Sequence, residues 1–290
     1  MSPWISASRP KTLVAGLIPV VLGSALAFQQ GGFRLAVFLC ALGGALAIQI
    51  GTNYVNDASD FERGADSLDR LGPPRMAASG LLTPKALYQG AGIAFFIALL
   101  FGIYLIATAG LWMLAIGLFS IFFAVIYTAG PFPLAYLGLG DFFVLVFFGL
   151  VAVLGTVFAH LHRIPPEATY LALATGLQGV ALIAVNNLRD IPTDKKVNKK
   201  TLAVRLGDRG SRFYYSALVF LPYLLWLPLQ MRLGGSFGFL PLLSLPLAFS
   251  NVDTCFRIQD RRQFNRLLGK TAALQLLFGI LAVVALVNAA

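Results

Sequence analysis

Two groups of asparagine and aspartate side chains occur far apart in this sequence, each at a spacing that suits one face of a helix. The members of the first group stand at positions i, i+4 and i+7, and those of the second at i, i+3 and i+7. The groups are Asn53, Asp57 and Asp60, and then Asn187, Asp190 and Asp194. Side chains at such spacings share a stripe of a helix. The sequence therefore predicts two carboxylate-bearing stripes that can act together.

Such stripes suit a divalent cation and a phosphorylated ligand. Carboxylate oxygens are hard ligands for Mg²⁺, which proteins usually hold with a few carboxylates together with substrate phosphates. Asparagine oxygens can join the site, and nearby guanidinium groups suit phosphate oxygens. Cations placed in this way stabilise a departing diphosphate. The alternative is that the acids only pair with basic neighbours as solvated charge, but the recurrence of the whole pattern favours a diphosphate site.

The remainder of the sequence is that of an integral membrane protein. Of its 290 residues, 58% are hydrophobic and 12% are charged, and apolar runs of about 20 residues, long enough to cross a bilayer, recur from end to end. We expect an all-α, polytopic membrane protein with nine transmembrane helices. The expected spans are 12–28, 35–54, 88–108, 111–128, 141–161, 168–188, 213–231, 238–254 and 271–288.

The basic residues are distributed unevenly between the two sides of these spans. With a cytoplasmic N-terminus, only Arg34, Arg163 and Arg232 of the 22 lie outside, and the other 19 lie inside. The positive-inside bias therefore predicts a multi-pass protein of the cytoplasmic (inner) membrane with its N-terminus in the cytoplasm. The net charge of +10 reflects this topology, so we expect no nucleic-acid partner, whereas anionic membrane lipid would be attracted to the basic loops.

Two inner loops concentrate the acidic charge. The loops near 57–87 and 189–212 hold eight of the twelve acidic residues, which places the predicted active site at the cytoplasmic face. The recurrence of asparagine, aspartate, aspartate and then basic residues suggests two repeats that share a site. Because no linker or low-complexity tract divides the chain, we expect residues 1–290 to form a single transmembrane domain.

Two further side chains are candidates for roles beside this site. Tyr127 ends the fourth expected span, where its electron-rich ring could stabilise an allylic cation. Asp141 opens the fifth expected span. We interpret Asp141 as an N-cap for free backbone N–H groups rather than as part of an acceptor pocket.

The two stripes resemble the motifs of a known family. The first aspartate-rich motif of the UbiA superfamily of intramembrane aromatic prenyltransferases is similar to NYVNDASD at 53–60, continuing through Gly64 and Asp66. The second motif is similar to NNLRDIPTD at 186–194. Further stretches resemble the 1,4-dihydroxy-2-naphthoate prenyltransferases of that superfamily. They are RPKTL at 9–13, GPPR at 72–75 with SGLLT at 79–83, YTAGP at 127–131 through GLGD at 138–141, and KKTLAVRLG at 199–207.

The resemblance implies a UbiA-type bundle of nine helices around a central cavity, open sideways to lipid and capped by the acidic loops. The implied catalytic residues are Asp57, Asp60, Asp190, Asp194 and Tyr127. The implied ligands of Mg²⁺ are Asn53, Asp57, Asp60, Asn187, Asp190 and Asp194. The residues expected to bind substrate are Asn53, Arg63, Asp66, Arg75, Asn187, Arg189, Lys195, Lys199 and Arg205, with Arg75 the candidate for the carboxylate of the acceptor. Asn198 stands where the family pattern has glycine, which leaves open whether Lys199 or Lys200 reaches the diphosphate.

The implied activity is Mg²⁺-dependent transfer of a polyprenyl group from a polyprenyl diphosphate to 1,4-dihydroxy-2-naphthoate. CO₂ and diphosphate are lost, and the product is the demethylmenaquinol of menaquinone biosynthesis. Another aromatic acceptor, such as 4-hydroxybenzoate or homogentisate, or a phytyl donor is an alternative. A cation-coupled transporter is a rival from a different class, but it would hold its acids near the membrane midplane. Prenyl length and oligomeric state stay open.

Overall fold

The computed structural model describes residues 2–65, 71–233 and 236–289 of the chain. Every regular element in this part is helical, as the sequence predicts. The elements are α1 (Pro3–Ala7), α2 (Pro10–Gln29), α3 (Leu35–Glu62), α4 (Pro84–Ala109), α5 (Trp112–Ile126), α6 (Gly140–Val144), η1 (Leu145–Leu154), α7 (Gly155–Leu161), α8 (Pro166–Lys196), α9 (Leu202–Leu233), η2 (Ser236–Ser244), α10 (Leu245–Arg257), η3 (Arg261–Gln263) and α11 (Phe264–Asn288).

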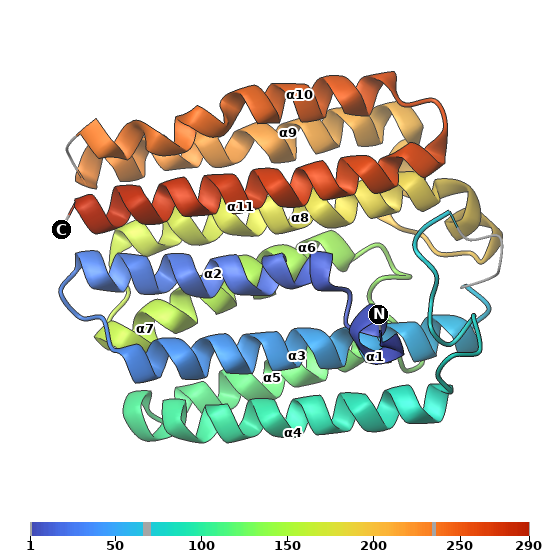
Figure 1. Ribbon diagram of the computed structural model, residues 1–290, viewed down its shortest axis with the longest axis horizontal. Helices are drawn as coiled ribbons and strands as arrows, with labels where there is room; N and C mark the ends of the chain where they lie inside the picture. Colours follow the sequence, from blue (N-terminus) through green and yellow to red (C-terminus); the bar gives the residue numbers. More distant parts are fainter. Residues whose placement is uncertain (1, 66–70, 234–235, 290) are drawn as a thin grey trace.

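The long helices run alongside one another in successive layers (Figure 1). In this view α9 and α10 form one edge, followed by α8 and α11, then α2 with α6 and α7, and finally α3, α4 and α5 at the opposite edge. One end of the bundle holds α1, the α3–α4 connection and the α8–α9 connection (residues 197–201). We call this the motif end, because α3 and α8 both finish there with their aspartates.

The expected set of nine apolar helical segments is confirmed. Within the described residues, eight helices are long and apolar enough to cross a membrane, and the shorter apolar helix α5 supplies the ninth segment. The fifth segment, Gly140–Leu161, is irregular, because a π-helix (η1) separates α6 from α7. Hydropathy does not report this change of helix type.

Both aspartate motifs are helical, as their spacing predicts, although the expected apolar spans end before the aspartates. α3 continues to Glu62 and α8 continues to Lys196, each beyond its expected apolar span. The last turns of α3 are enclosed by the protein, and Asp57 and Asp60 are only 1% and 4% exposed. Tertiary packing therefore extends the helix past the point where hydropathy falls.

Glycine residues allow η1 and α8 to pack closely. A Cβ atom on Gly149 would lie 2.6 Å from the backbone oxygen of Ala172 and 2.9 Å from the Cα of Gly176. Such distances leave no room for a side chain, so the two backbones are in direct contact. This contact fixes the position of α8, which carries the second motif.

A polar cluster ties the elements together at the end of the bundle opposite the motifs. The backbone N–H of Arg34 donates to Nδ1 of His160 at 3.1 Å, and Nε2 of His160 lies 3.0 Å from Oγ of Ser24. Because Nδ1 accepts a hydrogen bond, Nε2 carries the proton of the neutral ring and donates to Ser24. The Arg34 guanidinium also donates to the backbone oxygens of Ala159 and His160. These bonds join α2 and α7 to the residue that precedes α3.

The apolar core lies mainly on the α8, α9 and α11 side of the bundle. Trp226, Tyr215, Phe264 and Phe278 are among the largest fully buried side chains, and they pack against apolar residues of α2 and α8. In contrast, α4 exposes large apolar side chains on its outer face, as expected for a surface in contact with lipid. The side of the bundle formed by α2, α3 and α5 is less filled and encloses the cavity described below.

Candidate active site

Asp57 of the first motif holds the connection that follows α3. Its two carboxylate oxygens accept the backbone N–H groups of Met76 at 3.1 Å and Ala77 at 3.0 Å. The connection is thereby anchored over the motif end of the bundle. The carboxylate keeps further lone pairs with which it could bind a cation.

Asp60, one turn later, is bound by two side chains. The guanidinium of Arg75 lies 3.3 Å from Oδ2, and the hydroxyl of Tyr136 donates to Oδ1 at 3.0 Å. Arg75 is 7% exposed, so its ion pair with Asp60 is buried. The assignment of Arg75 to the acceptor's carboxylate stays a prediction, and in this structure its guanidinium faces Asp60.

Asn53, the first residue of the motif, contacts the turn between α1 and α2. Its Nδ2 donates to the backbone oxygen of Ser8 at 2.8 Å and lies 3.4 Å from Oγ1 of Thr12. The amide nitrogen is thus used to fix the N-terminal turn. The amide oxygen is the atom that a cation would bind.

Asp190 of the second motif forms a bidentate ion pair with its neighbour Arg189, with both nitrogen–oxygen distances at 2.7 Å. Arg189 is 2% exposed and also donates to Oδ1 of Asn265 at 2.7 Å. The ion pair orients Asp190, but all three nitrogens of the Arg189 guanidinium already donate hydrogen bonds within the protein. Contact between Arg189 and a diphosphate therefore stays a prediction that requires this ion pair to open or to be shared.

The two adjacent asparagines of the second motif point to different places. Asn186 lines the central cavity. The side chain of Asn187 instead donates to Oδ1 of Asp141 at 3.4 Å. Asn186 and Asp190 also have the four-residue spacing of Asn53 and Asp57. By position, Asn186 is the counterpart of Asn53, although the sequence analysis chose Asn187.

The interpretation of Asp141 as an N-cap is wrong. α6 begins at Gly140 after Leu139, so Asp141 lies inside the first turn, and no side-chain cap hydrogen bond forms at this helix. Asp141 is 8% exposed and accepts the hydrogen bond from Asn187. Asp141 can stabilise α6 only through the attraction between its negative charge and the positive N-terminal end of the helix dipole.

Tyr136 connects the two halves of the site. Besides its hydrogen bond to Asp60, its ring contacts two cations, with Lys199 Nζ 5.0 Å and the Arg63 guanidinium 5.4 Å from the centroid. Its backbone oxygen accepts the N–H of Lys200 at 2.9 Å. Tyr136 therefore contacts the end of α3 and the α8–α9 connection together. Burial, with the negative charge of Asp60 adding to it, raises the pKa of Tyr136, so the hydroxyl stays protonated and donates.

Asn198, which stands where the resemblance predicts glycine, adopts the left-handed αL conformation. Asn198 has φ +56°, a conformation that glycine and asparagine adopt more readily than other residues. The turn is closed by the backbone N–H of Lys199, which donates to the backbone oxygen of Asp194 at 2.8 Å. The side chain of Lys199 contacts the ring of Tyr136 whereas Lys200 is exposed, which favours Lys199 over Lys200 as the residue that faces the site.

The other predicted basic residues surround the same region. Arg63 donates to the backbone oxygen of Gly130, and Arg205 donates to that of Leu137 at 2.8 Å. Lys195 is exposed at the end of α8. Asp66 lies outside the described residues.

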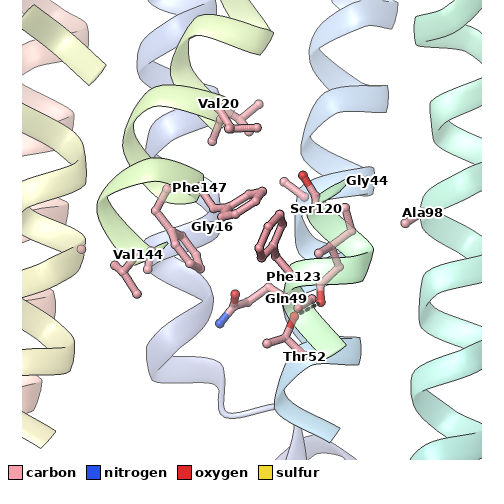
Figure 2. A pocket seen from close by; sticks show the side chains of 18 of the residues that line it. Gly16, Val20, Gly44, Gln49, Thr52, Ala98, Ser120, Phe123, Val144 and Phe147 are labelled. Atoms are coloured by element: carbon pink, nitrogen blue, oxygen red, sulfur yellow. Dashed lines mark hydrogen bonds between the residues drawn. The ribbon is translucent and has the colours of Figure 1, made fainter. Parts of the chain in front are cut away.

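A cavity of about 340 Å³ extends from the motif end into the bundle. At the motif end it is lined by Arg9, Tyr127 and three asparagines, Asn53, Asn56 and Asn186. Each asparagine lies one helical turn before an aspartate of a motif. Figure 2 shows its deeper part, where Phe123 of α5 and Phe147 of η1 face each other with ring centroids 5.3 Å apart. Gln49 and Thr52 of α3 supply polar groups to the wall (Figure 2).

The donor set of the motifs fits a cation that is shared with a substrate. In the described part of the chain, no three His, Cys, Asp or Glu side chains are grouped closely enough to hold a metal ion by themselves. Proteins usually bind Mg²⁺ through one or two carboxylates, together with waters and substrate phosphates. An asparagine and two aspartates on each helix offer oxygen atoms of the required kind.

Sequence reasoning missed three residues of this site. Tyr136 lies within the stretch 127–141 that the resemblance singled out, but an aromatic side chain in a loop carries no signal of its own. Arg9 was quoted only as part of a motif, because its inward direction depends on an unusual turn. Asn186 could have been identified from the sequence, because it precedes Asp190 by four residues, as Asn53 precedes Asp57.

The protein is a helical membrane bundle with two aspartate motifs at one end and a cavity that extends inward from that end. The sequence model of the UbiA prenyltransferase family matches residues 16–277, and the chain belongs to that family. A relative from Escherichia coli, named 1,4-dihydroxy-2-naphthoate octaprenyltransferase, is 36% identical over 288 residues, covering 97% of this chain and 93% of that protein. A relative of the same name from Mycobacterium tuberculosis is 41% identical over 216 residues, covering 74% of each chain.

Solved structures share the fold. The apo structure of a UbiA homologue from Aeropyrum pernix K1 superposes with a TM-score of 0.70 at 15% identity, covering 94% of this chain and 97% of that one. A UbiA homologue from Archaeoglobus fulgidus bound to GPP and Mg²⁺ gives a TM-score of 0.64 at 16% identity, covering 99% and 100%. At these identities the likeness shows the fold alone.

Proposed function

We propose that this protein transfers a polyprenyl group from a polyprenyl diphosphate to 1,4-dihydroxy-2-naphthoate, releasing CO₂ and diphosphate, in menaquinone biosynthesis. The observation that carries the proposal is the arrangement around Tyr136, which contacts Asp60 on one side and Lys199 on the other. An acidic group of the first motif and a basic group that follows the second motif are thus brought to the same tyrosine at the motif end. The names of the relatives supply the acceptor and the donor class.

The diphosphate binds at the motif end in this proposal. Lys199, Arg63 and Arg205 place positive charge near the phosphate oxygens, and Asp57, Asp60, Asp190 and Asp194 supply oxygen ligands for Mg²⁺. When bound, Mg²⁺ would neutralise charge on the diphosphate and so make it a better leaving group. Because Arg75 and Arg189 are already paired with Asp60 and Asp190, they act first by orienting these carboxylates.

The prenyl tail and the aromatic ring occupy the cavity. A volume of about 340 Å³ is at the lower end of the range for small-molecule sites, so it holds the reacting end of the tail and the ring, and a long tail continues toward lipid. Aromatic side chains such as Phe123 and Phe147 exclude water from the allylic cation. The ring of Tyr127 lines the cavity and is available to stabilise that cation.

The reaction is completed by the electrons of the acceptor. When the carbon–oxygen bond of the donor breaks, the bonding pair leaves with diphosphate. The ring carbon that carries the carboxylate then forms the new carbon–carbon bond. The carboxylate departs as CO₂, and the electron pair of the broken bond returns to the ring, which regains its aromaticity. In this proposal the motif end faces the cytoplasm, as the basic residues around it favour.

The test is product analysis with labelled acceptor. Purified protein in lipid nanodiscs receives Mg²⁺, carboxyl-¹³C dihydroxynaphthoate and a series of prenyl diphosphates, and mass spectrometry follows the quinol and ¹³CO₂. We expect one prenyl group per naphthoquinol, stoichiometric ¹³CO₂, and loss of both when EDTA is added. Turnover with 4-hydroxybenzoate or homogentisate but not with dihydroxynaphthoate would contradict the proposed acceptor. Cation flux in proteoliposomes without release of diphosphate would contradict the reaction class.

A further inference from the structure

Arg9 lies at a strained turn between α1 and α2. Its backbone has φ +51° and ψ +69°, the left-handed region, and Pro10 follows as the first residue of α2. This conformation is unfavourable for a residue with a side chain, and a following proline disfavours helical conformations further. Backbone strain of this kind persists where the surrounding structure enforces it, which often happens at functional sites.

The turn is held by the first aspartate motif. Asn53 donates to the backbone oxygen of Ser8, directly before Arg9, at 2.8 Å. The backbone oxygen of Arg9 accepts both the N–H of Thr12 at 2.9 Å and its hydroxyl at 3.0 Å. These bonds enforce the left-handed turn and direct the Arg9 side chain into the bundle.

The Arg9 guanidinium has unused hydrogen-bonding capacity inside the protein. Its Nη2 is buried and has no hydrogen-bond partner within the described residues. Arg75 and Arg189, in contrast, have carboxylate partners in Asp60 and Asp190. Burying an unpaired donor is costly, so the arrangement indicates a site built for a ligand that supplies the missing acceptor.

The position of Arg9 indicates which ligand this is. Among the described residues that line the cavity, Arg9 is the one with a charged side chain. The cations assigned to the diphosphate, Lys199, Arg63 and Arg205, gather instead around the loop that contains Tyr136. An anion that reaches Arg9 therefore belongs to the molecule inside the cavity, next to the reacting carbon of the prenyl group.

The electrostatic surroundings support an anionic ligand. Burial lowers the pKa of Arg9 below its ordinary value, while Asp57 and Asp60 oppose that change and Arg189 adds to it. Arginine nevertheless stays charged in proteins. A carboxylate in the cavity would offset the lost hydration of the guanidinium, whose planar donors match the two oxygens of a carboxylate.

We propose that Arg9, which lines the cavity, rather than Arg75, which is paired with Asp60, binds the carboxylate of the aromatic acceptor and so orients its ring, an inference that rests on the function proposed above. The guanidinium stabilises the carboxylate but has no charge to bind in CO₂ or in the quinol product. Arg9 therefore acts on acceptor binding and orientation and favours release of the product, and it supplies neither an acid nor a base to the step in which the carbon–carbon bond breaks.

The test combines two acceptors with two variants. Dihydroxynaphthoate is compared with 1,4-dihydroxynaphthalene, which lacks the carboxylate, by titration calorimetry on the full-length protein in nanodiscs without diphosphate or Mg²⁺. The variants are Arg9→Gln and Arg9→Lys. The control is Arg257→Gln, because Arg257 is 79% exposed and paired with Asp253 on α10, far from the cavity lining. Thermal unfolding of each variant shows whether it is folded.

We expect wild type and Arg257→Gln to bind the acid at least tenfold more tightly than the diol. Arg9→Gln should remove this preference with little change for the diol, and Arg9→Lys should keep part of it. In turnover, Arg9→Gln should raise the KM for dihydroxynaphthoate and leave the KM for the prenyl diphosphate within twofold. Equal weakening of both acceptors, or a raised KM for the diphosphate with the preference intact, overturns the inference. Wild-type protein that neither binds nor prenylates dihydroxynaphthoate overturns the proposed function itself.

Discussion

The hydroxyl of Tyr136 donates a 3.0 Å hydrogen bond to Oδ1 of Asp60, although the two residues are far apart in sequence. The ring of the same tyrosine lies over Lys199 from the other half of the site. A single side chain in the α5–α6 connection therefore sets the relative position of a carboxylate from α3 and a cation from the α8–α9 connection. The account of the diphosphate site depends on this link.

Tyr136→Phe should weaken binding of the prenyl diphosphate, because Asp60 loses a charge-assisted hydrogen bond. A bond of this kind contributes enough for a rise in KM of about tenfold. Tyr136→Ala should have a larger effect, since Lys199 and Arg63 also lose the ring that both contact. Steady-state kinetics in prenyl diphosphate, at saturating acceptor, measures both. Wild-type KM in Tyr136→Ala would remove Tyr136 from the site.

The raised pKa of Tyr136 predicts how this contribution varies with pH. Because the pKa lies above the ordinary value for tyrosine, the phenol keeps its proton at neutral and mildly alkaline pH. The hydrogen bond to Asp60 is therefore present throughout that range. The ratio of wild-type to Tyr136→Phe kcat/KM should be constant from about pH 7 to pH 9. A ratio that falls toward one across this range would show that Tyr136 ionises there.

Asp57 should have a structural role as well as a role in catalysis. Asp57→Ala removes the acceptor for two backbone N–H groups and should lower the free energy of unfolding by about 1–3 kcal/mol. Asp57→Asn keeps one oxygen acceptor and should be less destabilised, yet it should lose Mg²⁺-dependent transfer because the charge is gone. Thermal unfolding and turnover of both variants separate the two roles. Near-normal turnover in folded Asp57→Asn would defeat the metal assignment.

The adjacent asparagines of the second motif form a matched pair. Asn186 lines the cavity whereas Asn187 contacts Asp141. Asn186→Ala should therefore reduce kcat/KM for the prenyl diphosphate by more than Asn187→Ala does. Parallel kinetics on the two variants, with the same surfactant and lipid, gives the comparison. The reverse order of effects would support the original choice of Asn187.

The close contact between η1 and α8 predicts a stability difference between two glycine substitutions. Gly176→Ala places a methyl group 2.9 Å from the Cα of Gly149 and should destabilise the protein by about 1–3 kcal/mol. Gly92→Ala in α4 meets nothing within 4 Å and should be neutral or slightly stabilising, since alanine favours a helix. Thermal unfolding in the same detergent compares them. Equal midpoints would mean that the backbones are not in contact.

Hydropathy and charge made the transmembrane architecture predictable, because each span must bury a long apolar surface in lipid. The ends of α3 and α8 were not predictable in this way. The motif aspartates, such as Asp57 and Asp190, lower the hydropathy at the ends of these helices, although packing against the rest of the protein keeps the chain helical. The π-helix η1 was missed for a related reason, since its sequence is as apolar as that of a regular span.

The part of the site that could be predicted from the sequence is the set of aspartates, because a carboxylate can bind a cation whatever its exact direction. The helices that carry the two motifs, α3 and α8, both finish at the motif end of the bundle (Figure 1), and the roles of their aspartates as metal ligands stay predictions. Side-chain direction was not predictable. Arg9 points inward only because its turn is left-handed, Asp141 lies inside a helix turn rather than before it, and Arg75 is drawn toward Asp60 by the fold of the loop.

The most direct test asks whether α3 and α8 hold one diphosphate between them. Mg²⁺-dependent binding of a non-hydrolysable prenyl thiolodiphosphate is measured by calorimetry for wild type, Asp60→Asn, Asp190→Asn and the double variant. If both carboxylates act on one bound Mg²⁺–diphosphate, each single change should weaken binding strongly, and the double change should add much less than the sum of the two. Strictly additive losses, or a loss in only one of the single variants, would contradict a site shared by the two motifs.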